Sequence, residues 1–265
     1  MKILIKNGRV IDPLNKIDET SDILVSGGKI EKVAKKIDDK ADKVIDAKGL
    51  IVAPGFVDMH VHLREPGRED KETIRSGTRA AVRGGFTSVA CMPNTEPTID
   101  NPGIVKMVNG LAEKGASCNV FVVGAITEGR GGKKLADFAG MKKEGAVAVS
   151  DDGSSVDDAG LLSAALKACK KQKLTLIEHC EDKALSGKGV MNKSFVSTKM
   201  GLMGIPRESE YGIVRRNIEI AKKCGASIHI AHVSCKESVD IIRKAKKQGV
   251  GVTAETAPHY FSLTE

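Results

Sequence analysis

The sequence predicts an α/β protein whose larger part is a barrel of alternating strands and helices, preceded by a small β unit. From residue 55 onward, short apolar runs alternate with helix-like stretches. Runs of this kind are typical of strands that are buried on both faces of a parallel sheet. A second observation is that polar side chains lie at the ends of these runs, where they are candidates for a functional site.

Seven strands and six helices are predicted in the larger part. The strands are expected at residues 56–62, 88–94, 118–126, 146–152, 174–180, 227–234 and 251–259, and the helices at 70–83, 102–114, 133–144, 157–171, 208–224 and 236–247. Repeated strand–helix units form either an open doubly wound sheet or a closed barrel. No GxGxxG motif opens a helix and no Walker loop is present.

The polar residues at the strand ends favour the barrel. They are His60, His62, Asn94, Asp151, Asp152, His179, His232 and His259. In a barrel the carboxyl ends of all strands surround one mouth. In an open sheet, ends at opposite edges would lie too far apart to cooperate.

Residues 1–54 predict a small β unit. The segment ILIKNGRVID alternates in polarity, and Gly27-Gly28 and Lys48-Gly49 mark bends between strand-like segments. We therefore expect two domains, a small all-β unit at 1–54 and the barrel at 55–265.

Composition narrows the function classes. The net charge is 42 − 34 = +8, but the lysines are scattered and there are only 6 Phe, 2 Tyr and no Trp. Stacking platforms for nucleic acid are therefore lacking, and we expect no nucleic-acid partner. No stretch reaches the ~20 apolar residues of a membrane span, and the six cysteines form no CxxC pair. We expect a cytoplasmic protein with reduced thiols.

Four of the six histidines indicate a metal site. His60 and His62 stand two residues apart, so on a strand they project from the same face. Imidazole nitrogens suit zinc, although an isolated HxH also occurs as a structural pair. His179 and His232 end two further strands, which favours the metal. His229 has the opposite parity to His232, and we expect it to face the helices as a packed core residue.

Other polar residues at the mouth have candidate roles. One of Asp151 and Asp152 is expected to meet the metal, since adjacent strand residues diverge; helix capping or a turn is the alternative. Arg64 offers a planar fork for a substrate carboxylate, or a surface ion pair with a neighbouring glutamate. Asn94 is suited to binding the same carboxylate or to capping its loop.

Six motifs give the chain a family resemblance. GFVDMHVHLREPG, ACMPNTEP, SDDG, EHCED, IAHVS and TAETAPHYFSLTE follow one another in the order and spacing of the bacterial and archaeal type I dihydroorotases, members of the amidohydrolase superfamily. The resemblance covers essentially the whole chain. It implies a TIM-type (β/α)8 metal-dependent hydrolase barrel and a small sandwich, whose other strands come from the C-terminus of the family's chains.

The resemblance also implies the site residues. His60 and His62 match the ligands of the more buried zinc, Asp152 matches the aspartate ligand, and His179 and His232 match the ligands of a second zinc position. Arg64 and Asn94 match the residues that hold the substrate carboxylate, and His259 matches a histidine of less certain role. One or two zinc ions are implied.

The implied activity is the zinc-dependent, reversible cyclisation of N-carbamoyl-L-aspartate to (S)-dihydroorotate in pyrimidine biosynthesis. Hydantoinases and allantoinases are alternatives, but they usually carry a carbamylated lysine on the fourth strand, where this chain has GAVAVSDDG. A non-catalytic dihydroorotase-like partner of aspartate transcarbamoylase is another, although such homologues tend to lose the HxH histidines. A homodimer and an association with aspartate transcarbamoylase are expected partnerships.

The family's eighth strand carries a proton-shuttling aspartate in a DxAPH pattern, which this sequence lacks. We therefore expect an incomplete barrel of about seven strands, with the catalytic aspartate beyond Glu265 and weak or no activity in this chain. Either the chain is a truncated form or a partner supplies the missing piece. The Gly-rich segment 186–205, which lacks clear periodicity, is expected to be a mobile flap or a passive connector.

Overall fold

The fold is described from a computed structural model, which defines residues 1–263. The chain divides into two compact units, Met1–Phe56 and Val57–Glu265. Each unit is considered by itself.

The first unit is a five-stranded sheet. Its strands are β1 (Lys2–Asp12), β2 (Ile17–Ser26), β3 (Lys29–Ala34), β4 (Lys43–Asp46) and β5 (Ile51–Val52). The order is β3-β2-β1-β4, and β5 also pairs with β1. The hairpin of β1 and β2 is antiparallel, whereas β4 and β5 run parallel to β1.

A small cluster of Leu4, Leu24 and Ile37 forms the core of this sheet unit. Asp22 is buried beside it, and its carboxylate accepts backbone N–H groups of Asn7 at 2.9 Å and Ile37 at 3.0 Å. Those hydrogen bonds compensate the burial of the charge. The family resemblance implies a sandwich here, and the described residues of the unit form one sheet.

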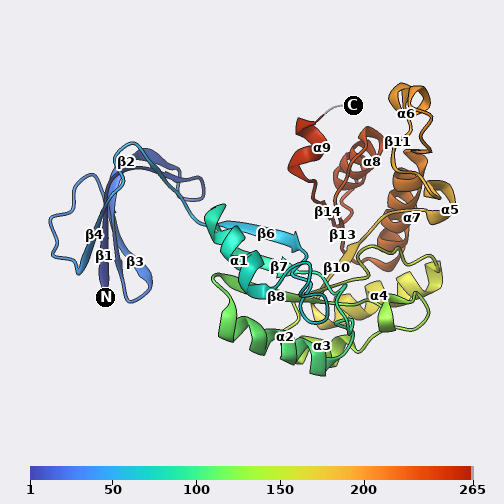
Figure 1. The fold of residues 1–265 in the computed structure, drawn as a ribbon, viewed down its shortest axis with the longest axis horizontal. Coiled ribbons are helices and arrows are strands. Elements are labelled where there is room, and N and C mark those ends of the chain that lie inside the picture. The colour runs from blue at the N-terminus through green and yellow to red at the C-terminus, as the bar shows by residue number, and fades with distance from the viewer. Residues whose placement is uncertain (264–265) are drawn as a thin grey trace. The chain divides into compact units, whose positions relative to one another are not determined.

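The second unit contains seven parallel strands in one curled sheet, an incomplete barrel (Figure 1). The strands are β6 (Phe56–Val61), β7 (Phe86–Cys91), β8 (Asn119–Gly124), β9 (Ala148–Ser150), β10 (Thr175–Glu178), β13 (Ile228–Ile230) and β14 (Val252–Ala254). Their order is β14-β13-β10-β9-β8-β7-β6. The predicted seven-stranded (β/α) barrel fold is therefore confirmed, with β6 and β14 as the two edges of the sheet.

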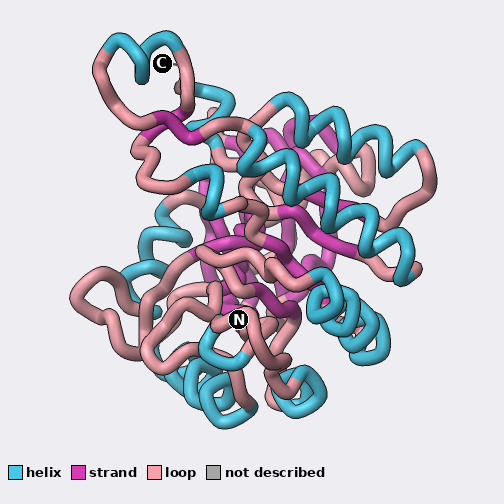
Figure 2. The backbone as a smooth tube through the Cα atoms, turned by 90° about the vertical axis from the view of Figure 1, so that its right-hand side faces the viewer, coloured by secondary structure: helices cyan, strands magenta, loops and turns pink. Residues whose placement is uncertain are grey.

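Helices follow the strands and lie along the outside of the sheet (Figure 2). The longer ones are α1 (Ile74–Arg83), α2 (Pro102–Gly115), α3 (Phe138–Lys143), α4 (Ala159–Gln172), α7 (Glu208–Cys224) and α8 (Lys236–Lys247). Side-chain caps begin several of them: Asn101 accepts the N–H of Ile104, and Asp158 accepts that of Leu161. Such caps satisfy backbone donors that have no partner within the helix.

Shorter elements occupy the connections. They are η1 (Glu128–Arg130), α5 (Lys183–Ser186), β11 (Met191–Asn192), α6 (Phe195–Lys199), β12 (Gly204–Ile205) and α9 (Pro258–Ser262). The segment 186–205 therefore contains a helix and two short paired strands, although its sequence has no clear periodicity. His259 lies in α9 and not at a strand end, because Pro258 occupies the first turn of a helix, where its fixed φ is favourable.

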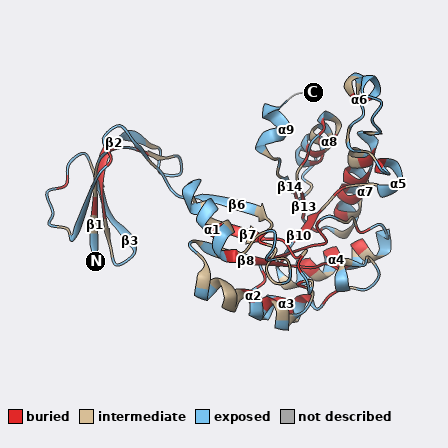
Figure 3. Ribbon diagram, in the orientation of Figure 1, coloured by how far each residue is buried: buried red, intermediate tan, exposed pale blue. Residues whose placement is uncertain are grey.

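The core of the barrel unit has two parts, one on each face of the sheet. The larger part joins alternate strand residues to the inner faces of the helices, as with Val149 and Leu162. The smaller part lies on the opposite, concave face. It consists of Met92, Val123, Ala148, Ile177 and Ala231. Figure 3 shows the buried residues along β8, β10 and the inner sides of α4 and α7, while α9 is exposed.

Among the described residues, no helix combines the length and apolarity that crossing a bilayer requires.

Candidate metal centre

Five predicted ligands come together at the carboxyl ends of four strands. His60 lies in β6 and His62 directly after it, while Asp152, His179 and His232 follow β9, β10 and β13. They form two triads that share Asp152: His60, His62 and Asp152, and Asp152, His179 and His232. Within each triad, the donor atoms all lie within 4.8 Å of one another. The site thus draws on strands spread across the whole curled sheet.

The first triad follows from the alternation of side chains along β6. Val61 packs against the helix-side core, so His60 and His62 project from the concave face. Their Nε2 atoms lie 3.2 and 3.6 Å from Asp152 Oδ1 and Oδ2, respectively. Asp152 is buried, with only 5% of its surface exposed, and its two oxygens therefore face the two imidazoles.

The second triad shares the Oδ1 atom of Asp152 with His60. His179 Nδ1 lies 2.8 Å from His232 Nε2, and these atoms lie 3.8 and 3.6 Å from Asp152 Oδ1. His232 has φ = 36°, in the left-handed region that non-glycine residues rarely adopt. This backbone turn directs His232 to the site after β13 has ended at Ile230.

The structure distinguishes the two aspartates that the sequence left open. Asp151 points away from the triads and is 1% exposed. Its carboxylate accepts the backbone N–H groups of Ile126 and Thr127 at 2.9 and 3.0 Å, and the Thr127 hydroxyl at 2.5 Å. Asp151 therefore anchors the loop after β8, and Asp152 alone of the two faces the histidines.

Each of three histidines has a polar partner on the ring nitrogen that faces away from Asp152. His60 Nδ1 lies 2.6 Å from Glu255 Oε1, His62 Nδ1 lies 3.0 Å from Asn94 Oδ1, and His179 Nε2 lies 3.2 Å from Glu181 Oε2. Such partners orient metal-binding imidazoles.

Glu255 and Glu181 were not predicted from the sequence. Both stand just beyond strand ends, after β14 and β10. This is the same position that singled out the other polar residues, so strand-end placement was the available signal for both.

Electrostatics separate the two histidines of the HxH motif. Burial lowers the pKa of His60, but hydrogen bonds and charge from Asp152 and Glu255 outweigh it and raise that pKa to about 9. For His62, burial prevails and lowers the pKa. Burial opposes ionisation of Asp152, yet its contacts with His232 and His60 hold the carboxyl pKa well below the usual value. The Asp152 carboxylate is therefore ionised and available as a ligand.

The donor set fits a transition-metal ion. Four imidazole nitrogens and a shared carboxylate are the ligand types that zinc and its neighbours prefer, whereas calcium and magnesium prefer oxygen donors. The described residues can therefore hold a metal ion at either triad.

Arg64 and Asn94 lie beside this cluster. Arg64 has φ = 60°; within residues 1–263 its guanidinium forms no hydrogen bond or ion pair, and its charge contributes to lowering the pKa of His62. Glu65 instead accepts the N–H of Ile74 at 2.8 Å, so the alternative of a Glu65 ion pair is not realised. Asn94 holds His62 with Oδ1 and places Nδ2 3.4 Å from Asp152 Oδ2.

The expectation for His229 was wrong. It pairs in register with Ile177, a member of the concave-face cluster, and it alternates with Ile228 and Ile230, which pack against the helices. His229 therefore faces the concave side. The counting from His232 failed because the chain leaves the strand at Ile230 and turns, which ends the two-residue alternation.

Known proteins resemble this chain in sequence. The family model described as dihydro-orotase-like matches residues 49–238. A dihydroorotase of Elusimicrobium minutum is 56% identical over 265 residues, which is 100% of this chain and 61% of the relative. A dihydroorotase of Pelotomaculum thermopropionicum is 51% identical and is covered to 62%. The chain thus spans about three fifths of the length of these curated relatives.

Solved structures share the fold. An L-hydantoinase (dihydropyrimidinase) from Arthrobacter aurescens superposes with a TM-score of 0.84 at 22% identity, covering 99% of this chain and 59% of that one. A D-hydantoinase (dihydropyrimidinase) from Thermus sp. gives a TM-score of 0.79 at 25% identity, with 98% and 58% covered. These likenesses concern the fold, whereas the family follows from the sequence matches and accords with the clustered histidines and aspartate. The chain belongs to the dihydro-orotase-like family.

Proposed function

We propose that the protein to which these residues belong is a dihydroorotase, which closes N-carbamoyl-L-aspartate reversibly to (S)-dihydroorotate in pyrimidine biosynthesis. The observation that carries the proposal is the sharing of Asp152 between two histidine pairs. Relatives at 50–56% identity that bear this name support the substrate.

The metal we propose is zinc, as one or two ions. His60, His62 and Asp152 would hold one ion, and His179 and His232 a second one beside the same aspartate. When bound, zinc lowers the pKa of water to about 7 and polarises a carbonyl group as a Lewis acid. Both effects suit the hydrolysis of a cyclic amide and its reversal.

Arg64 and Asn94 are proposed to hold the substrate. The free guanidinium of Arg64 binds the carboxylate through two parallel N–H···O bonds, which fixes the ring in one orientation. Asn94 adds an N–H donor from Nδ2 while its Oδ1 keeps His62 in place. Because both substrate and product carry a carboxylate, these contacts serve both directions of the reaction.

A proton must move between water and the ring nitrogen, and the carboxylates at the described site are committed elsewhere. Asp152 faces four imidazoles, Glu255 contacts His60, and Glu181 contacts His179. We therefore expect a polypeptide of these 265 residues to bind zinc and to convert the substrate weakly.

We propose that its residues 1–54 form part of a composite sandwich and that 55–265 form the barrel without its last strand.

Zinc analysis and a substrate panel test the proposal. The purified protein is assayed for zinc per chain, and then, as the full-length gene product, with dihydroorotate, hydantoin and allantoin. We expect zinc to copurify and dihydroorotate to be hydrolysed fastest. Preference for hydantoin or allantoin would indicate another cyclic amidase, and absence of zinc would favour a non-catalytic partner. Robust dihydroorotate turnover by a chain verified to end at Glu265 would contradict the expected weak activity.

Assembly and location belong to the same proposal. We propose a cytoplasmic enzyme that forms a homodimer and associates with aspartate transcarbamoylase. Light scattering of the purified protein, alone and after mixing with the transcarbamoylase, would measure both contacts.

A further inference from the structure

Glu255 joins the two edges of the barrel sheet at the metal centre. His60 lies in β6 and Glu255 follows β14, the first and last strands of the seven-stranded order. Nevertheless, Glu255 Oε1 lies 2.6 Å from His60 Nδ1. Both side chains are largely buried, with 12% of His60 and 17% of Glu255 exposed. The contact therefore forms away from most of the solvent, where a charged hydrogen bond is stronger.

The two nitrogens of His60 face different groups. Nε2 lies 3.2 Å from Asp152 Oδ1, and Nδ1 faces Glu255. A neutral imidazole carries one proton, and an ionised carboxylate only accepts. When Nε2 binds a metal ion in place of a proton, pairing with Glu255 would keep the remaining proton on Nδ1 and leave the Nε2 lone pair for the metal.

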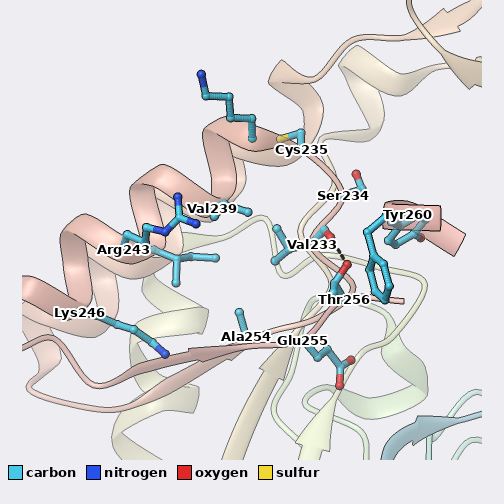
Figure 4. Close-up of a pocket in the computed structure, with 13 residues that line it drawn as sticks. Val233, Ser234, Cys235, Val239, Arg243, Lys246, Ala254, Glu255, Thr256 and Tyr260 are labelled. Carbon is cyan, nitrogen blue, oxygen red and sulfur yellow. Dashed lines mark hydrogen bonds between the residues drawn. The ribbon is translucent and has the colours of Figure 1, made fainter. Parts of the chain in front are cut away.

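The backbone of Glu255 is held firmly in place. Its N–H donates to Ile230 O at 3.0 Å, and its carbonyl accepts the N–H of Val233 at 2.8 Å. The next residue repeats the attachment, because the Thr256 hydroxyl donates to Val233 O at 2.8 Å, as Figure 4 shows. These bonds fix the carboxylate to the loop that leads to His232.

A second histidine stands behind Glu255. His229 is 4% exposed, and its Nε2 lies 3.5 Å from Glu255 Oε2. Its Nδ1 lies 2.7 Å from Thr253 Oγ1. At 3.5 Å, His229 Nε2 is within ion-pair distance of this carboxylate but forms no hydrogen bond with it or with any other described residue. Both oxygens of Glu255 thus lie near an imidazole.

We propose that Glu255, backed by His229, is a positioning residue that fixes the orientation and the Nδ1–H tautomer of His60 for metal binding. The inference rests on the proposed function only in requiring that a metal ion binds at the first triad. The Nδ1 atom of His62 faces the neutral Asn94. The Nδ1 atom of His60 faces the charged Glu255. A carboxylate behind the ring raises the basicity of a ligand histidine.

The opposite wall of Glu255 is a hollow of about 440 Å³ between α8 and the chain after β14. Figure 4 shows Glu255 at one end of it, near Ala254 and Thr256. Gln has the shape of Glu and Ala is smaller, so neither substitution at Glu255 overpacks its surroundings. This makes the residue suitable for mutagenesis.

Glu255→Gln and Glu255→Ala, made in the full-length gene product, test the proposal. Gln keeps the shape and one acceptor oxygen, whereas Ala removes both. Zinc affinity is measured by competition with a chromogenic chelator, and the His60 tautomer of the zinc-loaded protein, in which the imidazole is neutral, by ¹⁵N–¹H correlation of the imidazole nitrogens. We expect zinc affinity to fall about 10-fold for Gln and about 100-fold for Ala, the range typical of such partners. His60 should lose its uniform Nδ1–H form in the Ala variant.

Two further variants complete the design. His229→Leu removes the group behind Glu255 and should weaken zinc binding in the same direction but less than Glu255→Ala. Glu113→Gln on the exposed side of α2 removes one carboxylate without approaching the site and should leave zinc affinity unchanged. Thermal unfolding of each metal-free variant separates a loss of fold from a loss of ligand orientation.

Two results would overturn the inference. The first is that folded Glu255→Gln and Glu255→Ala both bind zinc with an affinity within about twofold of the wild type, which is well short of the usual effect. The second is an unchanged tautomer of His60 in the Ala variant. Failure of the proposed activity gives a different result. A wild-type protein that binds zinc and loses it on substitution of Glu255, but converts no dihydroorotate, would refute the substrate and leave the role of Glu255 intact.

Discussion

His60 Nδ1 and Glu255 Oε1 lie 2.6 Å apart although His60 belongs to one edge strand of the seven-stranded sheet and Glu255 directly follows the other. A flat sheet of this width would separate its edges by about six strand spacings of nearly 5 Å each. The curl of the parallel sheet brings the edges together at the carboxyl ends of the strands. The metal centre is therefore a product of sheet curvature as much as of its ligands.

Asp152→Ala and Asp151→Ala should affect different properties. The first should remove zinc binding and the second should lower the free energy of unfolding. Within the described residues 1–263, Asp152 belongs to both triads. Its loss should therefore abolish zinc binding at both positions and leave the fold intact. Loss of Asp151 should leave two buried N–H donors of Ile126 and Thr127 without partners, at a cost of about 1–3 kcal/mol each.

Elemental analysis and urea unfolding of the metal-free variants measure these two effects. An Asp151→Ala protein that loses zinc at unchanged stability would show that the two aspartates have been assigned to the wrong roles.

Arg64→Gln should weaken substrate binding without affecting zinc. The Arg64 guanidinium has no hydrogen-bond partner within residues 1–263, and a hydrogen bond between charged groups contributes about 1.5–3 kcal/mol. KM for dihydroorotate should therefore rise about 10- to 100-fold in the full-length enzyme, while zinc content stays constant. Arg68→Gln is the matched control, since Arg68 pairs with Asp70 at the surface. Equal KM values for the two variants would remove Arg64 from the substrate site.

Buried thiols should resist alkylation. Burial raises the pKa of Cys91 and of Cys169 to about 12. Compared with an ordinary thiol near pKa 9, the reactive thiolate at pH 8 is then about a thousandfold scarcer. Mass spectrometry after a brief iodoacetamide pulse at pH 8 should find both unmodified in the native protein and all six cysteines modified in urea. Native labelling of Cys91 would show that the β7 end opens.

Gly67→Ala should destabilise the loop that carries Arg64. Gly67 has φ = +96°, and a Cβ atom there would collide with the backbone carbonyl oxygen of Glu96. Because the obstacle is backbone, the loop must move, and we expect a loss above about 2 kcal/mol of unfolding free energy. Gly129→Ala is the control: its φ is also positive at +58°, but nothing lies within 4 Å, so only the strain of the left-handed backbone should appear. Equal losses for both would contradict the steric argument.

Local patterns of the sequence determined much of this protein. The alternation of apolar runs and amphipathic stretches predicted seven strands and the helices between them, because each strand must bury both faces and each helix one. The spacing of His60 and His62 placed both on one face of β6, and the divergence of adjacent strand residues meant that only one of Asp151 and Asp152 could face them.

Only the tertiary structure decided which partners those residues have. Counting along the sequence misplaced His229, because the turn at His232 interrupts the alternation after Ile230. It also missed Glu255, whose role depends on contact between strands almost 200 residues apart in sequence. Side-chain alternation is a local property of each strand, whereas the curl that joins β6 to β14 arises from the packing of the whole sheet.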